Sequence, residues 1–406
     1  MGYRKLIFKS TAWMMALRIV TQGLVVLKLV VITRLLQPSD FGAFAIVVLL
    51  LTIFDTLTDI GFSYAAIHMQ LDMKKAARTF LTVTFLRGVI LTVATIACIP
   101  FAVNFFHDSS ITILLVIASL VPLLKGAENP HVIGFQKDLR FEKEFVFRLV
   151  PALAITISTI ILSIFYKSAL ALVIGLVIGT SFELISSYLI ASRDFSKPFS
   201  RKYFKKLVSY GKWITAGGLS TYLTTQLDTV VIGRMLGSSS LGLYDLAFKT
   251  GSTAFNEITN VLSQIMFPVY SKIKTDKARL KKLFLKHLIF TTIFAFCINI
   301  PLLLFPKEII TLFFGSKWID AAGVLQILAI YGFLRAAIGP IGPLFLSVGI
   351  PNTLAKLNFL HFLILLVLII PLVSKFQITG AASAITISYA IITPYYLFKL
   401  YKLFTK

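Results

Sequence analysis

The sequence VVITRLL at residues 30–36 returns as VVIGRML at residues 230–236. The match keeps the same offset of 200 residues further downstream, where Gly42 corresponds to Gly242. A long repeat without slippage indicates two structurally equivalent halves. Because 57% of the residues are apolar and the mean hydropathy is +0.87, each half is predicted to be a bundle of membrane helices. A two-fold repeat of such a bundle is typical of a transporter.

Apolar segments of about 20 residues, the length that crosses a bilayer, recur along the whole chain. We predict twelve of them, at residues 12–33, 43–66, 80–104, 111–126, 147–166, 168–191, 213–236, 243–268, 284–305, 321–348, 354–373 and 378–400. Six per half is an even number, so both halves enter the membrane in the same direction. The predicted fold is therefore an all-α integral membrane protein with about 12 transmembrane helices, in two parallel six-helix lobes around a central cleft.

These segments also predict the domains. They are an N-terminal six-helix lobe at residues 1–191, a basic cytoplasmic linker at 192–212 and a C-terminal six-helix lobe at 213–406. The first apolar segment is too long for a cleavable signal peptide and is expected to be the first membrane helix. The linker mixes aromatic and basic residues, so we expect it to lie as a surface helix on anionic lipid.

The net charge of +23 suggests a nucleic-acid partner at first, but the distribution of the cations indicates a membrane orientation instead. With the N-terminus in the cytoplasm, 29 Lys and Arg residues fall on the cytoplasmic side and six on the outer side. This asymmetry is the positive-inside pattern. We predict a multi-pass protein of the cell inner (plasma) membrane, with both termini cytoplasmic and no nucleic-acid partner.

No enzymatic constellation is found in the sequence. The five histidines are scattered without metal-ligand spacing. No phosphate-binding or dinucleotide-binding glycine pattern occurs. We expect no catalytic residue, no metal and no cofactor, so uphill transport would have to draw on an ion gradient, the membrane potential or trapping of the product.

Eleven ionisable residues lie inside the predicted spans, where charge is costly and a functional role is the default hypothesis. The cations are Arg18, Lys28, Arg87, Lys249 and Arg335, and the carboxylates are Asp55, Asp59, Glu183, Asp228, Asp245 and Glu257. Because the two signs nearly balance, most of these groups must neutralise each other or carry protons. The candidates for ion coupling or gating are Asp55, Asp59, Asp228, Glu257 and Glu183.

The first predicted helix carries two of these cations. Arg18 and Lys28 are ten residues apart, which places them within about 80° of each other on the helix, with a rise of about 15 Å between them. One face thus offers positive charge at two depths, along which a phosphate or carboxylate group could pass. An equally open interpretation is that each cation pairs with a carboxylate or extends to the interface.

The second predicted helix carries two carboxylates on one face. Asp55 and Asp59 are four residues apart, so each would raise the pKa of the other, and together they could hold a proton or a sodium ion. The alternative is that they are ion-pair partners of Arg18 and Arg87, which lie at a similar depth.

Three further features concern pairing and bending. Lys28 and Asp228 occupy equivalent positions in the repeat, and we hypothesise that they form a gate across the cleft. Asp245 and Lys249 have the spacing of an ordinary helical ion pair. The run GPIGP at residues 339–343 is expected to break or bend its helix.

Several motifs together resemble a known family, over essentially the whole chain. They are RLLQPSDFG at 34–42, DIGFSYAAI at 59–67, ENP at 128–130, KDLRF at 137–141, DTVVIGR at 228–234, LGLYDLA at 241–247 and LFFGSKW at 312–318. They look like polysaccharide-type flippases, related to O-antigen and colanic-acid flippases, of the multidrug/oligosaccharidyl-lipid/polysaccharide exporter superfamily.

The resemblance implies a two-lobed protein that alternates access and moves a polyprenyl-pyrophosphate-linked oligosaccharide, the repeat unit of a polysaccharide, across the cytoplasmic membrane. The implied partners are an undecaprenyl-pyrophosphate-linked glycan, membrane lipids, and a glycan polymerase and other assembly proteins. It also implies that cations of the central cavity engage the pyrophosphate or acidic sugars. Arg18, Lys28 and Lys249 would be the candidates, with Arg335 and Arg87 behind them.

Two alternatives remain open from the sequence. A multidrug and toxin cation antiporter of the same superfamily would need an acidic cavity and a carboxylate in the first helix, where this chain has Arg18 and Lys28. A non-transporting membrane subunit of a glycan-assembly complex would need neither the repeat nor the charges inside the spans.

Overall fold

Helices account for all the regular secondary structure in the described part of the chain, residues 3–58, 72–138 and 140–405 of a computed structural model. The chain divides into two compact units, residues 1–222 and 223–406. The three-part domain division predicted from the sequence stays a prediction.

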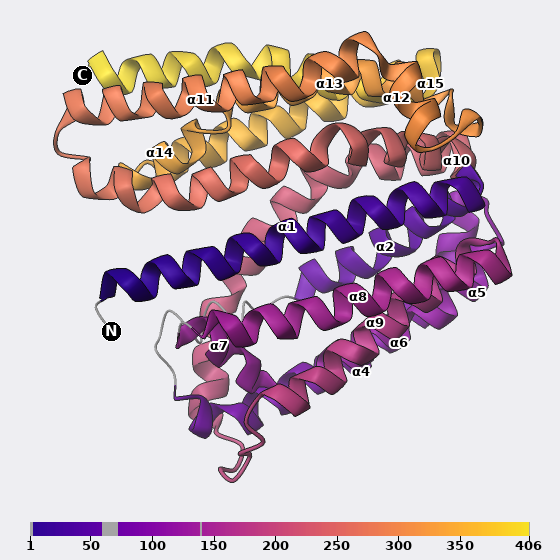
Figure 1. Ribbon diagram of the computed structural model, residues 1–406, viewed down its shortest axis with the longest axis vertical. Helices are drawn as coiled ribbons and strands as arrows, with labels where there is room; N and C mark the ends of the chain where they lie inside the picture. Colours follow the sequence, from indigo (N-terminus) through magenta and orange to yellow (C-terminus); the bar gives the residue numbers. More distant parts are fainter. Residues whose placement is uncertain (1–2, 59–71, 139, 406) are drawn as a thin grey trace. The chain divides into compact units, whose positions relative to one another are not determined.

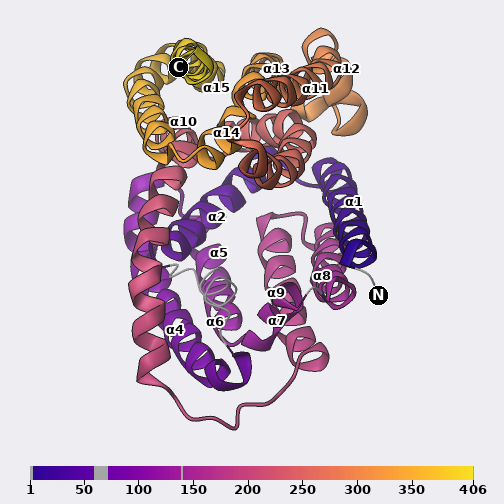
Figure 2. The ribbon, with the colours of Figure 1, turned by 90° about the vertical axis from the view of Figure 1, so that its left-hand side faces the viewer.

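Unit 1 contains the first nine labelled elements and the start of a tenth. They are α1 (Tyr3–Leu35), α2 (Pro38–Thr58), α4 (Met73–Phe106), α5 (Ile111–Ala118), α6 (Leu120–Gly126), the 3-10 helix η1 (Pro130–Val132), α7 (Ile133–Lys137), α8 (Phe141–Tyr166), α9 (Ala169–Ile190) and the first part of α10 (Arg201–Ile273). Figure 2 shows α1 beside α8, where the rings of Trp13 and Phe145 meet edge to face with centroids 5.0 Å apart.

Unit 2 contains the rest of α10 and six further elements. They are α11 (Lys277–Leu304), α12 (Pro306–Phe313), η2 (Ser316–Trp318), α13 (Ala321–Ile338), α14 (Ile341–Ser347) and α15 (Pro351–Thr405). The break between α13 and α14 falls at Gly339 and Pro340, inside the run that predicted a bent helix. Since proline lacks the backbone N–H of a helical hydrogen bond, the ladder is interrupted there.

The longest two helices each join two predicted spans. The helical run of α10 is interrupted at Gly237, whose φ is 78°, and that of α15 at Gln377, whose φ is 54°. Both breaks coincide with the predicted ends of spans, at residues 236 and 378. In the described part of the chain, eight helices are long and apolar enough to cross a membrane, or nine if the bent pair Ile111–Gly126 and Pro130–Lys137 is one span. The chain is therefore a multi-pass, all-helical membrane protein.

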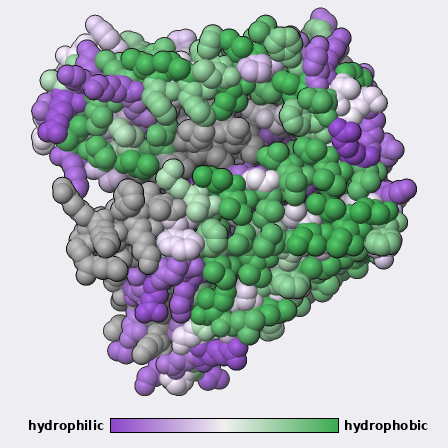
Figure 3. All heavy atoms as spheres, viewed as in Figure 1, coloured by the Kyte–Doolittle hydropathy of each residue, from purple (hydrophilic) through white to green (hydrophobic). Residues whose placement is uncertain are grey.

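The surface agrees with a lipid environment. Figure 3 shows a broad apolar surface over α8 and the adjoining part of α1, with hydrophilic residues gathered toward the helix ends. Many large side chains on these helices point outward, such as Ile19, which is 70% exposed, and Phe165, which is 77% exposed. Lipid tails solvate such side chains as well as a protein core does, so this exposure is not costly in a bilayer.

Small residues bring the helices of unit 1 into close contact. Gly175 and Gly179 on α9 face Thr159 and Ile155 on α8 so closely that a Cβ at either glycine would overlap the opposing side chain. Figure 1 shows the two helices side by side. This small-xxx-small spacing is a common way for membrane helices to approach, because packing contacts replace the hydrophobic driving force.

A second glycine contact fixes α4 against α6. A Cβ on Gly88 would lie 2.6 Å from the carbonyl oxygen of Pro122, and a Cβ on Gly126 would lie 2.6 Å from that of Thr84. The Thr84 hydroxyl donates a hydrogen bond to the Gly126 carbonyl at 3.0 Å. Since the opposing atoms belong to the backbone, they cannot move aside as a side chain would.

We expect Gly88→Ala to lower the free energy of unfolding by about 1–2 kcal/mol, because the added methyl group overpacks a backbone contact. Chemical denaturation in detergent measures the change. Gly23→Ala is the matched control, since a Cβ at Gly23 meets nothing within 4 Å and alanine favours a helix. Equal stability of the two variants would contradict this account of the α4–α6 contact.

Candidate charged pocket in unit 1

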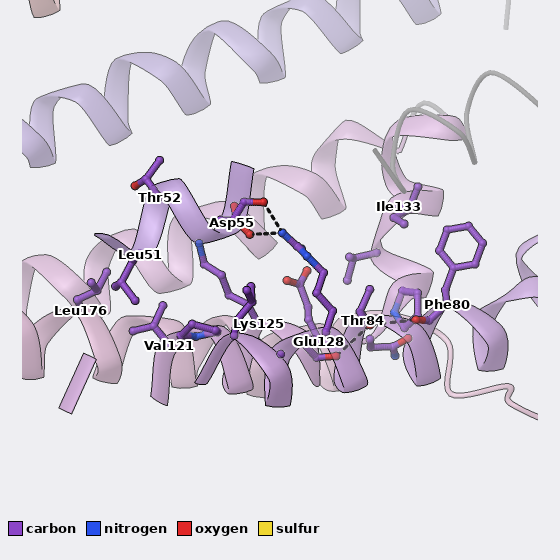
Figure 4. Close-up of a pocket in the computed structure, with 18 of the residues that line it drawn as sticks. Leu51, Thr52, Asp55, Phe80, Thr84, Val121, Lys125, Glu128, Ile133 and Leu176 are labelled. Carbon is purple, nitrogen blue, oxygen red and sulfur yellow. Dashed lines mark hydrogen bonds and ion pairs between the residues drawn. The ribbon is translucent and has the colours of Figure 1, made fainter. Parts of the chain in front are cut away.

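A pocket of about 450 Å³ lies within unit 1, among α2, α4, α6, α7 and α8. This volume is in the usual range of ligand sites. The charged residues that line it are Asp55, Arg87, Lys125, Glu128, Glu144 and Arg148. Figure 4 shows Asp55 on one wall, with Lys125 and Glu128 on the facing one. The remaining lining is largely apolar, so charge is concentrated at this place in the unit.

Arg87 joins α4 to the end of α2. Its Nη2 atom lies 2.6 Å from the Asp55 carboxylate and 2.7 Å from the Asp55 carbonyl oxygen. Its Nε atom donates to the Thr58 hydroxyl at 2.8 Å. The alternative that Asp55 is an ion-pair partner of Arg87 is therefore confirmed. A guanidinium held by three oxygen atoms is well oriented, and it has further N–H groups to offer to a ligand.

Arg148 connects α8 to α9, and its partner Glu144 is bonded to α7 as well. Its Nε atom donates to Glu144 Oε1 at 3.1 Å, and its Nη1 atom donates to Glu183 Oε1 at 3.0 Å. Gln136 on α7 donates to the same oxygen of Glu144 at 2.9 Å. Glu144 is only 6% exposed, and a buried carboxylate of this kind needs both partners. The side chain of Glu183, a candidate for ion coupling, thus lies beside an arginine that also lines the pocket.

Glu128 lies in the turn between α6 and η1, outside the long apolar helices. Its side chain takes part in no hydrogen bond within the described residues. Burial, with the negative charge of Glu183 nearby, raises the pKa of Glu128 to about 7, although Arg148 and Lys125 act in the opposite direction. A partly buried carboxyl group without a donor prefers its neutral form.

The backbone of this turn is firmly held. The Tyr188 hydroxyl donates to the Ala127 carbonyl at 3.0 Å. The Asn129 side chain donates to the Ser192 carbonyl at 2.9 Å, and His131 Nε2 lies 2.9 Å from the Asp194 carbonyl. The turn is therefore bonded to the end of α9 and to the connection at residues 191–200, which leads into α10.

In unit 2, Asp228 is the most enclosed of the sequence candidates. It is 3% exposed, and one carboxylate oxygen accepts a hydrogen bond from the Tyr244 hydroxyl at 2.7 Å. The other accepts from the Thr229 backbone N–H at 2.8 Å. No described cation forms an ion pair with it. A buried carboxylate held only by neutral donors is the kind of group that takes up a proton or a cation.

Two further candidates lie in unit 2. Lys249 forms the predicted helical ion pair with Asp245, with 2.6 Å between Nζ and Oδ2. Arg335 on α13 donates to the Tyr331 hydroxyl at 3.0 Å, and its guanidinium carbon lies 5.9 Å from the centre of the Tyr331 ring. Aromatic contact of this kind stabilises a partly buried guanidinium while leaving other N–H groups available.

The structure gives less detail for the remaining candidates from the sequence. Arg18 and Lys28 both lie on α1 and are partly exposed. Asp59, and the side chain of Glu257, lie outside the described residues. The hypothesised pair of Lys28 with Asp228 joins the two units and stays a prediction.

Four charged residues of the pocket are not among the candidates from the sequence: Lys125, Glu128, Glu144 and Arg148. Lys125 and Arg148 fall on the predicted cytoplasmic side, and Glu128 belongs to one of the family motifs. Their signal was present, because Glu144 and Arg148 have the i, i+4 spacing of a helical ion pair. In the part of the chain that the structure covers, no group of three or more His, Cys, Asp or Glu residues could hold a metal ion.

Comparison with known proteins gives consistent matches. A family model described as "Polysaccharide biosynthesis protein" matches residues 31–323. The lipopolysaccharide biosynthesis protein WzxC of Escherichia coli K12 is 24% identical over 351 residues, which are 86% of this chain and 71% of WzxC.

Two solved structures share the fold. The lipid II flippase MurJ, in an inward closed conformation, has a TM-score of 0.77 and 16% identity, over 96% of this chain and 88% of that one. An inward-facing multidrug resistance transporter of the MATE family has a TM-score of 0.70 and 12% identity, over 94% and 95%. At such identities the likeness shows the fold alone.

Proposed function

Because the chain belongs to the polysaccharide biosynthesis protein family, we propose that it is a flippase, which moves a polyprenyl-pyrophosphate-linked oligosaccharide across the cytoplasmic membrane by alternating access. The observation that carries this proposal is the family match over residues 31–323. The similarity to WzxC along 86% of the chain and the apolar helices support it. The fold alone does not separate a flippase from a cation antiporter, since it resembles both.

The finer architecture belongs to the same proposal. It comprises about twelve spans in two six-helix lobes, with both termini in the cytoplasm. The proposed substrate is an undecaprenyl-pyrophosphate-linked glycan. The breaks at Gly237 and Gln377 support it, because each divides one long helical run where two predicted spans meet. An assembly role beside a glycan polymerase is compatible with this activity.

Within this proposal, the cations of the spans bind the anionic group of the substrate. Arg18 and Lys28 supply positive charge at two positions along α1. Lys249 and Arg335 supply further hydrogen-bond donors in unit 2. Arg335 supports the assignment best, because Tyr331, its hydrogen-bond partner in the described part of the chain, is uncharged. Arg87 is a weaker candidate, since its Nε and Nη2 atoms already donate hydrogen bonds to Thr58 and Asp55.

We expect the double variant Arg18→Ala/Lys28→Ala to bind an undecaprenyl-pyrophosphate-linked oligosaccharide at least about tenfold more weakly, since a hydrogen bond between ionised groups contributes about 1.5–3 kcal/mol. Native mass spectrometry of the purified protein, titrated with this lipid and with an organic cation, measures the effect. Lys281→Ala/Lys282→Ala, which removes two exposed cations of α11, is the control. Retention of the organic cation in place of the glycolipid, unchanged by the α1 substitutions, would favour the antiporter.

Asp228 is the described carboxylate that best fits ion coupling. We expect Asp228→Asn to keep the contact with Tyr244 and to bind the glycolipid normally, while transport in proteoliposomes loses its dependence on a proton or sodium gradient. The reason is that asparagine keeps the shape of the side chain but cannot change its charge. An unchanged gradient dependence in this variant would remove Asp228 from the coupling mechanism. Tyr244→Phe, which deletes only the hydroxyl donor, serves for comparison.

A further inference from the structure

The carboxylate excess beside the unit 1 pocket has no role in the proposed binding of the substrate. Three carboxylates, Glu128, Glu144 and Glu183, meet one guanidinium, that of Arg148. The guanidinium bonds two of the three, and Glu128 is left without a donor. Lys125, three residues before Glu128, is exposed, and its ammonium group forms no hydrogen bond with the Glu128 carboxylate in the described structure. With Arg148 alone the cluster is two positive charges short, and it is still one short when Lys125 is counted.

A metal ion is poorly suited to supply the positive charge that this cluster of carboxylates lacks. Cations such as sodium or calcium need several oxygen ligands around one point. No described group of acidic residues is close enough for that, and Glu144 Oε1 already accepts from Gln136 and Arg148. A proton needs one oxygen atom only, and Glu128 supplies it.

We propose that Glu128 is a proton-binding site, and that its protonation controls how firmly the turn at residues 127–132 holds the connection at residues 191–200. Glu183 on α9 lies close enough to disfavour the ionised form of Glu128, so loss of the proton adds electrostatic repulsion between this turn and α9. The hydrogen bonds from Tyr188, Asn129 and His131 cross the same joint.

Every charged group around Glu128 enters this balance. Those in the cluster are Lys125 on α6, Glu144 and Arg148 on α8, and Glu183 on α9. Across the pocket, Asp55 and Arg87 are bonded to each other. His131 in η1 bonds the Asp194 carbonyl. Since Arg148 is shared between two other carboxylates and Lys125 is exposed to solvent, a proton neutralises Glu128 more directly than either cation does.

Two measurements on the full-length protein test the proposal. Infrared difference spectroscopy between pH 5 and pH 9 should show a protonated carboxyl band that is lost with a midpoint near pH 7 and is missing in Glu128→Gln. Hydrogen exchange of residues 126–132 and 191–200, corrected for intrinsic rates, should increase from pH 6 to pH 8 in the wild type. It should stay at the low-pH level in Glu128→Gln. Glu142→Gln, which removes an exposed carboxylate from the first turn of α8, should behave as the wild type.

A second variant keeps the test decisive if Glu128→Gln does not fold. Glu183→Gln removes the facing negative charge, so the midpoint should move to lower pH by about one unit. A structural role alone would not move it. The proposal is overturned if the carboxyl band is the same in Glu128→Gln and the wild type, or if exchange at residues 191–200 depends on pH equally in both. Neither measurement uses transport, so the outcome is independent of the flippase assignment.

Discussion

Arg148→Met is expected to lower the free energy of unfolding by about 2 kcal/mol. The substitution leaves Glu144, which is 6% exposed, and Glu183 next to each other without their shared cation. Removing one partner of a buried ion pair usually costs about 3–5 kcal/mol. We expect less here, because the Arg148 side chain is 45% exposed and water can partly solvate the remaining charges. Chemical denaturation in detergent at pH 8 measures the loss.

Two comparisons separate charge from packing in this prediction. Arg148→Lys keeps the charge but loses the fork that reaches both carboxylates, so it should fall between the wild type and Arg148→Met. Glu144→Gln combined with Arg148→Met should recover part of the stability, because it removes one of the unpaired charges. A loss below about 0.5 kcal/mol in Arg148→Met would mean that the pair resembles an ordinary surface salt bridge.

The sequence predicted the fold class because its signals are local and strong. Apolar length alone identifies a membrane helix, and the all-helical, multi-pass fold is confirmed. The number of helices was harder to predict, because the ends of spans depend on single residues. Gly237 and Gln377 interrupt long helical runs without a proline at the break. Each break lies next to a predicted end of a span, and the φ value identifies the residue at which the helix stops.

The charged site was predicted only in part. The pair of Arg87 with Asp55 was within reach, since both residues lie in predicted spans and their charges are opposite. The junction of Arg148 with Glu144 and Glu183 was not, because it requires α8 and α9 to be neighbours. That contact depends on Gly175 and Gly179. The sequence alone does not show which neighbouring helix a glycine in an apolar helix faces. The environment of Glu128 could not be predicted for another reason. This residue lies in a turn, and its partial burial comes from the tertiary structure.

The stability of the protein is expected to depend on pH through Glu128. Its pKa rises from an ordinary value of 4.5 to about 7 in the folded protein. The folded state therefore binds the proton more tightly than the unfolded state. The resulting stabilisation is complete below about pH 4.5 and is lost as the pH rises through 7. A shift of this size corresponds to about 3 kcal/mol.

The difference between wild type and Glu128→Gln isolates this contribution, because other titrating groups cancel. We expect the wild type to lose about 3 kcal/mol relative to the variant between pH 4.5 and pH 8.5, measured by denaturation at a series of pH values. Glu142→Gln, at an exposed position of α8, should show no such trend. The opposite slope, with the wild type gaining stability as the pH rises, would mean that Arg148 and Lys125 outweigh burial and hold Glu128 ionised in the folded protein.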